Sequence, residues 1–379
     1  MREHPPKLLF LVTEDWYFCS HRLPLAVAAR TDGFEVVVAT RVNQDQARIA
    51  AAGLRLIPLT WSRRGFNPFM ELGVLWKLIR IYRREKPDVV HHVAIKPVLY
   101  GSLAAWFGSV PGIVNALGGL GFIFSSETRM ARTLRPLAKA AFRMLLNVGR
   151  SLLIVQHLDD QRLLVEGGMI DGSRVRIIRG AGVVINEFVP RPEPAGVPLV
   201  MLAARLLWDK GVGEFVEAAR NLLQQGVQAR FVIVGQGDPE NPASIPDSQL
   251  KNWQESGFIE WWGKRSDMAD VLSSAHVICL PTAYGEGVPK VLLEAAACGR
   301  PIIATDVPGC REIVREGENG LLVPPGNVTA LTEAIRHLVG AAEIRQEMGL
   351  RGREIAETEF SVDSVIRETL SIYRELLAR

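Results

Sequence analysis

The residues best suited to chemistry in this chain are two glutamates, Glu286 and Glu294, in the segment TAYGEGVPKVLLEAAACG. An apolar run, HVICLP, precedes them and predicts a buried strand. Gly287 then allows a tight turn, and Pro289 suits the first position of a helix because its φ angle is already set. A strand, a turn and a helix start direct backbone N–H groups and the positive end of a helix dipole toward one point, which predicts an anion site.

The carboxylates beside this anion site indicate a sugar. They do not suit phosphate, whereas an ionised carboxylate accepts two hydrogen bonds from a vicinal diol. We therefore expect a phosphorylated sugar or a nucleotide-sugar, bound by Glu294 and by the turn and helix start, Gly287, Val288, Pro289 and Lys290. An ordinary strand–helix unit with a glutamate on its helix is the alternative.

Two cations form a second constellation upstream, in MLAARLLWDKG. Arg205 and Lys210 follow an apolar strand and lie in the loop before the next helix. Two cations at such a strand end can bind a diphosphate. Taken alone this spacing is a weak signal, and a solvated loop is the alternative.

Both constellations resemble the signature of the retaining glycosyltransferases of family 4, which have the GT-B fold. That fold consists of two Rossmann-like, doubly wound α/β domains facing a cleft. In this family two glutamates separated by seven residues bind the donor, and an Arg and a Lys bind its diphosphate. The resemblance covers most of residues 8–360 and includes VPGCREIV and NGLLVPPGN. It implies that Glu286, Arg205 and Lys210 are the catalytic residues, with Glu286 orienting the donor sugar and Glu294 the ribose.

Two further loops, GQGDP and WGKRSD, follow strands of the second half. The resemblance places such loops around the base and ribose of the nucleotide, which makes Gly235, Gly237 and Lys264 expected donor-binding residues. The two glycines could instead be simple turn residues. A nicotinamide-dependent oxidoreductase is not favoured, because the loop after the first strand, TEDWYFCSH, contains no glycine.

Three loops of the first half resemble the branch of the family that acts on polyprenyl-diphosphate-linked glycans: TEDWYFCSHRLP, HHVAIKPVLYG and GGLGFIFSS. We expect them at the carboxyl edge of the first sheet. Ser20 is the expected N-cap of the next helix, with His21 and Arg22 in its first turn. The expected acceptor-binding residues are His21, His91, Lys96, Gly118 and Gly119. For His91 an ordinary strand-end role is the alternative, and for Lys96 a solvated side chain.

The chain departs from the family pattern at two positions. Many retaining relatives have a histidine that contacts the donor sugar where Gly118 stands, so a histidine-assisted mechanism at that position is untenable here. Val184 stands where relatives commonly carry an aspartate, which leaves residues 180–188 out of the expected site.

Length and composition favour two domains. The chain has 379 residues, of which 48% are hydrophobic and 22% charged, which is typical of a globular protein. We expect an acceptor-binding domain over 1–190, a linker over 191–198, a nucleotide-sugar-binding domain over 199–360, and a terminal helix over 361–379 that crosses back to the first domain. A net charge of +3 argues against nucleic acid as a partner. Four scattered cysteines suit a reducing cytoplasm, and no apolar run is long enough to span a membrane.

A basic amphipathic helix is expected over residues 127–150, and such helices bind anionic lipid. Its cations are Arg129, Arg132, Arg135, Lys139, Arg143 and Arg150. A second basic face contains Trp76, Lys77, Arg80, Arg83, Arg84 and Lys86. These helices predict a peripheral protein on the cytoplasmic face of the inner membrane. Solvated faces of core-packed helices are the alternative.

The sequence therefore predicts a retaining hexosyltransferase that moves a sugar, an N-acetylhexosamine by preference, from a UDP-sugar to a polyprenyl-diphosphate-linked acceptor in glycan assembly. No Asp-x-Asp motif is present, so no metal site is expected. The alternatives are a UDP-sugar 2-epimerase of the GT-B fold, a GDP-mannose-dependent transferase and a non-catalytic glycan-binding protein.

Overall fold

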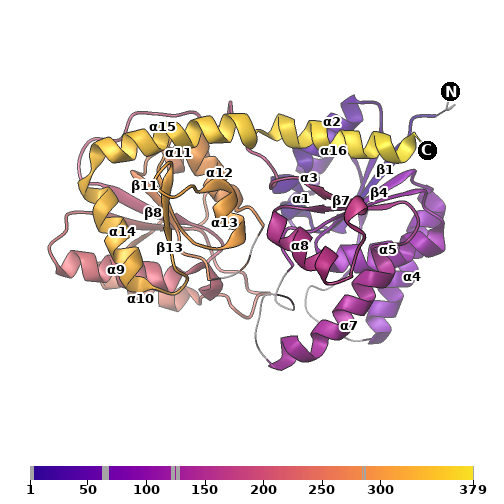
Figure 1. The fold of residues 1–379 in the computed structure, drawn as a ribbon, viewed down its shortest axis with the longest axis horizontal. Coiled ribbons are helices and arrows are strands. Elements are labelled where there is room, and N and C mark those ends of the chain that lie inside the picture. Colours follow the sequence, from indigo (N-terminus) through magenta and orange to yellow (C-terminus); the bar gives the residue numbers. More distant parts are fainter. Residues whose placement is uncertain are drawn as a thin grey trace. The chain divides into compact units, whose positions relative to one another are not determined.

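The computed structural model describes residues 4–61, 68–120, 124, 129–283, 285 and 287–378. The chain forms two compact units, shown as ribbons in Figure 1. The first domain consists of Met1–Ala181 together with Asp363–Arg379, and the second of Gly182–Val362.

The described part of the first domain contains a seven-stranded parallel sheet in the order β3-β2-β1-β4-β5-β6-β7. Its strands are β1 (Lys7–Glu14), β2 (Glu35–Arg41), β3 (Arg55–Pro58), β4 (Val89–Val93), β5 (Gly112–Ala116), β6 (Ser151–Val155) and β7 (Val175–Ile177). Its helices are α1 (Asp15–His21), α2 (Leu23–Thr31), α3 (Gln46–Ala51), α4 (Pro68–Glu85), α5 (Ile95–Gly108), α7 (Arg129–Leu145), α8 (Leu158–Glu166) and α16 (Val362–Leu377).

The apolar run of β1 explains why this sheet is covered on both faces. Phe10 packs in one core cluster with residues of α2 and α16, whereas Leu9 and Leu11 pack in another with residues of α4 and α5. Successive side chains of a strand point to opposite faces, so a continuous apolar strand requires helices on both sides.

The second domain repeats this arrangement with a six-stranded parallel sheet in the order β10-β9-β8-β11-β12-β13. Its strands are β8 (Leu199–Ala203), β9 (Arg230–Val234), β10 (Glu260–Trp261), β11 (Val277–Leu280), β12 (Ile302–Thr305) and β13 (Gly320–Val323). Its helices are η2 (Trp208–Lys210), α9 (Val212–Gln224), α10 (Asp247–Glu255), α11 (Met268–Ser273), α12 (Lys290–Ala297), α13 (Pro308–Ile313), α14 (Val328–Gly340) and α15 (Ala342–Glu359).

Both sheets reverse their strand order beside their first strand. The reversal lies between β1 and β4 in the first domain and between β8 and β11 in the second. In doubly wound sheets ligands bind at this switch point, beyond the carboxyl ends of the strands. The prediction of two Rossmann-like domains is confirmed, and the sheet order fixes where each domain can bind a ligand.

The segment expected to be a linker, 191–198, belongs to the second domain. Arg345 donates to the carboxylate of Glu193 at 2.9 and 2.8 Å, and Arg300 donates to the carbonyl oxygen of Arg191 at 2.9 Å. His276 is hydrogen-bonded to the carbonyl oxygen of Pro194 at 2.9 Å. These contacts fix the proline-rich segment to the domain it precedes, so the chain leaves the first domain earlier, after Ala181.

Helix α16 packs on the first domain. The hydroxyl of Tyr373 lies 2.5 Å from Nδ1 of His91 on β4, and both side chains are buried. Arg150 donates to the carbonyl oxygen of Glu375 at 3.2 Å, and Arg176 pairs with the Glu375 carboxylate at the same distance. Residues close to the end of the chain therefore complete the core of the domain that the chain builds first.

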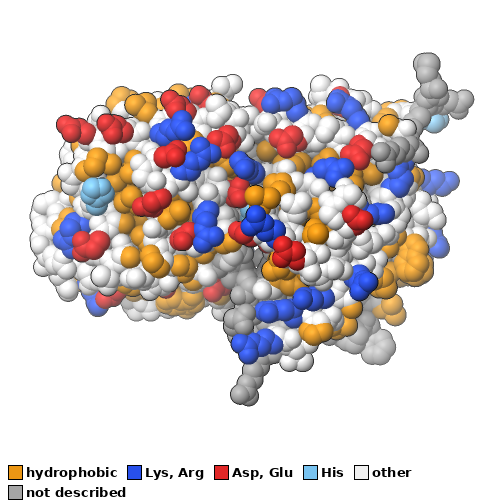
Figure 2. Space-filling view, viewed as in Figure 1, with side chains coloured by type: hydrophobic (Ala, Val, Ile, Leu, Met, Phe, Trp, Pro, Cys, Tyr) orange, Lys and Arg blue, Asp and Glu red, His pale blue; other side chains and the backbone are white. Residues whose placement is uncertain are grey.

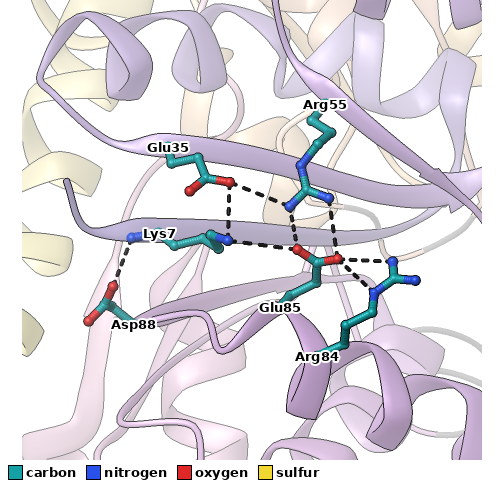
Figure 3. Close-up of polar contacts among 6 residues, drawn as sticks. All are labelled: Lys7, Glu35, Arg55, Arg84, Glu85 and Asp88. Atoms are coloured by element: carbon teal, nitrogen blue, oxygen red, sulfur yellow. Dashed lines mark hydrogen bonds and ion pairs between the residues drawn. The ribbon is translucent and has the colours of Figure 1, made fainter. Parts of the chain in front are cut away.

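An ion-pair network lies at the amino ends of β1, β2 and β3, opposite the edge where ligands are expected (Figure 3). The buried carboxylate of Glu85 accepts hydrogen bonds from Arg55 and from Arg84, and Lys7 pairs with Glu35 at 3.1 Å. The hydrogen bond from Arg55 is the main cause that lowers the pKa of Glu85 to about 2, and its burial opposes this. The network is a stability element far from the candidate site.

Candidate functional site

The loops after β8 and β11 are joined at the switch point of the second domain. The Thr282 hydroxyl donates to the carbonyl oxygen of Asp209 at 3.0 Å, and the backbone N–H of Ala283 donates to the same oxygen at 2.9 Å. Gly211 has a φ of +72°, and a Cβ there would lie 2.0 Å from the carbonyl oxygen of Pro281. The loop that carries the two cations is thus fixed against the start of the glutamate segment.

The loop after β9 is joined to the same region. The backbone N–H of Leu206 donates to the carbonyl oxygen of Gln236 at 2.9 Å. Gly235 has a φ of +138°, and a Cβ there would lie 1.9 Å from the carbonyl oxygen of Ala204. Gly235 is therefore required by the close approach of two loops. Lys264 is exposed and follows Gly263, whose carbonyl oxygen accepts from the N–H of Gly235 at 2.8 Å.

The two predicted cations lie on this joined loop. Arg205 is 42% exposed at its side chain and pairs with Asp238 at 3.2 Å, so its guanidinium contacts the loop after β9 while facing solvent. Lys210 ends η2 and is half-buried. Because the loop is held on both sides, the positions of both residues are set by backbone contacts rather than by their own charges.

Glu294 lies on α12 and is 7% exposed. Burial raises the pKa of its carboxyl group, and the Lys290 ammonium, 2.7 Å away, opposes that rise. Pro289, expected at the first position of the helix, is instead the N-cap residue of α12, and Gly299, with a φ of +68°, follows the C-cap. Glu286 lies outside the described residues, and its role stays a prediction.

The second domain thus gathers a buried carboxylate, a helix start and two cations at one edge of its sheet. Val288 is buried next to Pro289, while Gly237 packs so closely that a Cβ would lie 2.7 Å from the Ser244 hydroxyl. Chemically, cations and helix N–H groups suit a diphosphate, and the carboxylate suits a diol.

At the switch point of the first domain, the loop after β1 forms a helix that the sequence did not predict. Ser20 lies within α1, so its expected role as an N-cap is wrong; the N-cap of α2 is Arg22. His21 ends α1, and its ring stacks on that of Tyr17 with centroids 4.1 Å apart. The Asp15 carboxylate fixes α1 by accepting the backbone N–H groups of Asn43, Gln44 and Asp45.

Gly118 and Gly119 follow β5 at the same edge, and Gly119 has a φ of +112°. A Cβ at Gly118 would lie 3.5 Å from the Tyr17 hydroxyl and 3.5 Å from Nε2 of Gln156, which are ordinary contacts. Tyr17 and Gln156 therefore lie on the side of Gly118 where a side chain would project. Neither residue was predicted from the sequence, although Gln156 directly follows β6.

His91 does not lie at the surface. Its side chain is 1% exposed, stacks on Phe10 with centroids 5.1 Å apart, and is hydrogen-bonded to Tyr373. Burial is the main cause that lowers the pKa of its imidazole well below the usual value. A ring enclosed in this way cannot contact an acceptor, so the expectation of acceptor binding is corrected to a role in the core.

Lys96 is not a solvated lysine. Its ammonium lies 2.8 Å from the Glu71 carboxylate on α4 and 5.5 Å from the centre of the Tyr100 ring. An acceptor anion at this position would have to compete with Glu71. Lys96 therefore stays a candidate for binding the acceptor only in combination with other groups.

Helix α7 presents a mixed surface. Phe142 and Leu145 are buried against the domain, whereas Leu137 is 69% and Met144 55% exposed. Lys and Arg side chains gather over this helix in Figure 2. The exposed cations of α7 are Arg132, Lys139 and Arg143. Arg150 lies beyond the end of α7 and contacts α16 instead. Within the described ranges no helix is long and apolar enough to cross a membrane.

The described residues contain no group of His, Cys, Asp and Glu side chains that could hold a metal ion. All four cysteines are buried.

Two family models match the chain. One, described as glycosyl transferases group 1, matches residues 197–341, and one described as glycosyl transferase 4-like matches residues 7–156. Together they cover most of the chain, one in each domain.

Full-length relatives have related descriptions. The chain is 26% identical to the N,N'-diacetylbacillosaminyl-diphospho-undecaprenol α-1,3-N-acetylgalactosaminyltransferase of Campylobacter jejuni over 94% of this chain and 95% of that protein. It is 24% identical to the UDP-Gal:α-D-GlcNAc-diphosphoundecaprenol α-1,3-galactosyltransferase of Escherichia coli over 72% and 71%. The solved structure of Anabaena Alr3699/HepE in complex with UDP superposes with a TM-score of 0.78 at 18% identity, covering 97% of this chain and all (100%) of that one.

Proposed function

This chain belongs to the group 1 glycosyltransferases, and we propose that it transfers a sugar from a UDP-sugar to a polyprenyl-diphosphate-linked glycan with retention of configuration. The sugar would be an N-acetylhexosamine, the class that is transferred by the Campylobacter relative according to its description. Both relatives act on undecaprenol-diphosphate-linked sugars by their descriptions. The Escherichia relative is described as using UDP-Gal.

One observation carries the donor side of the proposal: the cation loop and the glutamate segment are joined by the two hydrogen bonds to the Asp209 carbonyl oxygen. This contact, next to Lys210, supports a site in which the cation loop and the segment leading to α12 act on one ligand. A leaving UDP places negative charge on its diphosphate, and preorganised cations and N–H groups stabilise that charge without a metal ion. Glu294 would accept the ribose hydroxyls.

The proposed retention needs no protein nucleophile. Attack by the acceptor hydroxyl on the same face from which UDP leaves forms the new C–O bond as the old one breaks, and the hydroxyl proton passes to the departing phosphate oxygen. Glu286 would orient the donor sugar in this step. Tyr17 and Gln156, around Gly118, are candidate polar contacts for the acceptor sugar.

Membrane association is part of the proposal, because a polyprenyl acceptor is anchored in a bilayer. The exposed cations and apolar side chains of α7 suit anionic lipid. On α4, Arg80 lies over the Trp76 ring at 3.8 Å, and Trp76 is 57% exposed. Such a pair suits a lipid interface, where aromatic rings and cations both concentrate.

The deciding experiment incubates the protein with radiolabelled UDP-sugars and synthetic polyprenyl-diphosphate-linked mono- and disaccharides, then follows label in the lipid fraction and release of UDP. Transfer to lipid with release of UDP supports the proposal. Formation of an epimer without any acceptor would instead identify a 2-epimerase. Transfer from GDP-mannose alone would identify a different donor class.

A further inference from the structure

Arg22 is a buried cation without a described counter-charge. It joins α1 to α2 at the switch point of the first domain and is 6% exposed. Its Nε is buried and has no hydrogen-bond partner among the described residues.

The side chains known to lie near Arg22 do not supply a negative charge to balance its guanidinium. Burial is the main cause that lowers the pKa of His91 and raises the pKa of Tyr373, and Arg22 lies close enough for its charge to act on both: it lowers the His91 pKa further and opposes the rise at Tyr373. Neither ring carries a negative charge at neutral pH, since burial keeps the imidazole neutral and the phenol protonated. Nε2 of His91 is also buried without a partner.

The other two buried arginines of the described chain both donate to oxygen atoms through their guanidinium groups, although Nε of Arg300, like Nε of Arg22, is buried without a hydrogen-bond partner. Arg300, 2% exposed, donates to the carbonyl oxygens of Arg191, Pro192 and Ser273. Arg345, 5% exposed, pairs with Glu193 through two nitrogens and donates to two further carbonyl oxygens. A buried charge without such partners is costly, so a protein keeps one mainly where a ligand completes it.

A second feature of the same switch point is an unusual backbone conformation at the start of α5. Ala94, directly after β4, has φ +81° and ψ 163°, a conformation that is strained for any residue except glycine. It is the N-cap of α5, which runs for 14 residues, and no side chain caps that helix start. The free N–H groups and the positive dipole end of α5 thus lie directly after β4. This strand neighbours β1, which leads into the segment of Arg22.

We propose that Arg22 binds a phosphate oxyanion of the acceptor, with the start of α5 beside it, and that this contact selects diphosphate-linked acceptors. The inference rests on the proposed function for the identity of the acceptor. An arginine fork suits two oxygens of a phosphate group. The proposed function assigns the diphosphate of the donor to Arg205 and Lys210, and we assign the anion at Arg22 to the second substrate.

The first experiment measures binding of inorganic pyrophosphate by calorimetry with UDP in excess, so that the donor site is occupied. It compares the wild type with Arg22→Met and with Arg30→Met, which removes an exposed arginine from the same helix. We expect Arg22→Met to weaken pyrophosphate binding at least tenfold and Arg30→Met to leave it unchanged. Equal binding by wild type and Arg22→Met would overturn the inference.

The second experiment measures thermal unfolding of the same variants. A buried charge that waits for a ligand destabilises the free protein, so Arg22→Met without ligand should unfold at or above the wild-type temperature. Pyrophosphate should raise the unfolding temperature of the wild type only. A lower unfolding temperature with an unchanged pyrophosphate effect would show that Arg22 is structural. Should Arg22→Met fail to fold, Arg22→Lys takes its place, with weaker pyrophosphate binding expected and unaltered binding overturning the inference.

Transfer kinetics separate this inference from the proposed function. Arg22→Met should raise the KM for a polyprenyl-diphosphate-linked acceptor at least tenfold while leaving the KM for the UDP-sugar unchanged. An unaltered acceptor KM in an active enzyme overturns the inference and leaves the function standing. Pyrophosphate binding that depends on Arg22 in a protein without such transferase activity supports the anion site and removes the proposed acceptor.

Discussion

The ammonium of Lys290 lies 2.7 Å from the carboxylate of Glu294, one turn further along α12. Glu294 is almost fully buried, whereas the side chain of Lys290 is 28% exposed. The ion pair therefore keeps a carboxylate available in surroundings that favour its protonated form. A ligand with a vicinal diol can replace part of that stabilisation by donating two hydrogen bonds.

Nucleotide binding should depend on the charge of Glu294. Glu294→Ala should weaken UDP binding, and wild-type affinity should fall as pH is lowered through the Glu294 pKa, which burial places above its usual value of 4.5. Titration calorimetry between pH 5 and pH 8 measures both effects. Glu294→Gln should lose this pH dependence; an unaltered pH profile in that variant would contradict the assignment.

The roles of the two glutamates should separate. Glu286→Gln should impair sugar transfer more than UDP binding, because we expect Glu286 to contact the donor sugar, whereas Glu294→Ala should show the reverse. Initial rates and UDP titrations on both variants decide this. The opposite ranking means that the two roles are exchanged.

Arg205→Ala and Lys210→Ala should each lower turnover about a hundredfold. Loss of one charge-assisted contact to a departing diphosphate costs roughly 3 kcal/mol in the transition state. Steady-state kinetics at saturating substrate measure the effect, and Arg220→Ala, an exposed arginine on α9, is the matched control. Near-normal turnover in both variants would rule out their role in departure of UDP.

The ion-pair network around Glu85 should make stability depend on acid pH. Its pKa is lowered from 4.5 to about 2, so the folded state holds the carboxylate ionised where the unfolded state binds a proton. The stabilisation is complete above pH 4.5 and is lost as pH falls toward 2. It amounts to at most about 3 kcal/mol, reduced by screening because Arg55 is 45% exposed.

Urea unfolding between pH 3 and pH 7 tests this network. Glu85→Gln should lower the free energy of unfolding at pH 7 and flatten its decline toward pH 3. Glu35→Gln, at a more exposed carboxylate of the same network, should have a smaller effect. A parallel decline in wild type and Glu85→Gln would show that other carboxylates dominate acid unfolding.

Reversing the charge of α7 should remove membrane binding. Changing Arg132, Lys139 and Arg143 together to Glu should abolish sedimentation with anionic vesicles, and salt should weaken wild-type binding because charges are screened over about 10 Å at 0.1 M. Transfer to a short water-soluble acceptor should persist. Changing Arg220, Lys251 and Arg351 to Glu in the second domain is the control, and equal losses from both triple variants would mean that only net charge matters.

Local patterns predicted much of the fold. The strand expected before the loop TEDWYFCSH is β1, Lys7–Glu14, and α12 begins after Pro289 and ends before Gly299 because proline and glycine fix backbone angles within a few residues. Strands that alternate with helices form a parallel sheet, so the loops that follow the strands were expected at one edge of the sheet in each domain.

The burial and contacts of residues that pack against distant segments of the sequence could not be predicted. His91 stands at a strand end, but its partner Tyr373 lies 282 positions away, and only that contact shows that the imidazole is enclosed. Arg22 was expected in the first turn of the helix after Ser20, and nothing in the local pattern indicated its burial, since arginine is rarely buried. Ser20 has the side chain of a good N-cap, yet the loop before it forms α1, which Asp15 fixes from its first residue.

The place of α16 has a consequence for synthesis of the chain. Domains of growing chains fold in order of emergence from the ribosome, yet the first domain contains residues 363–379 and encloses the second in the sequence. The second domain can fold as soon as residue 362 has emerged, while the apolar surface that receives Leu370, Tyr373 and Leu376 is still open. The inner domain can therefore complete its core first, because the core of the outer domain stays incomplete until α16 has emerged.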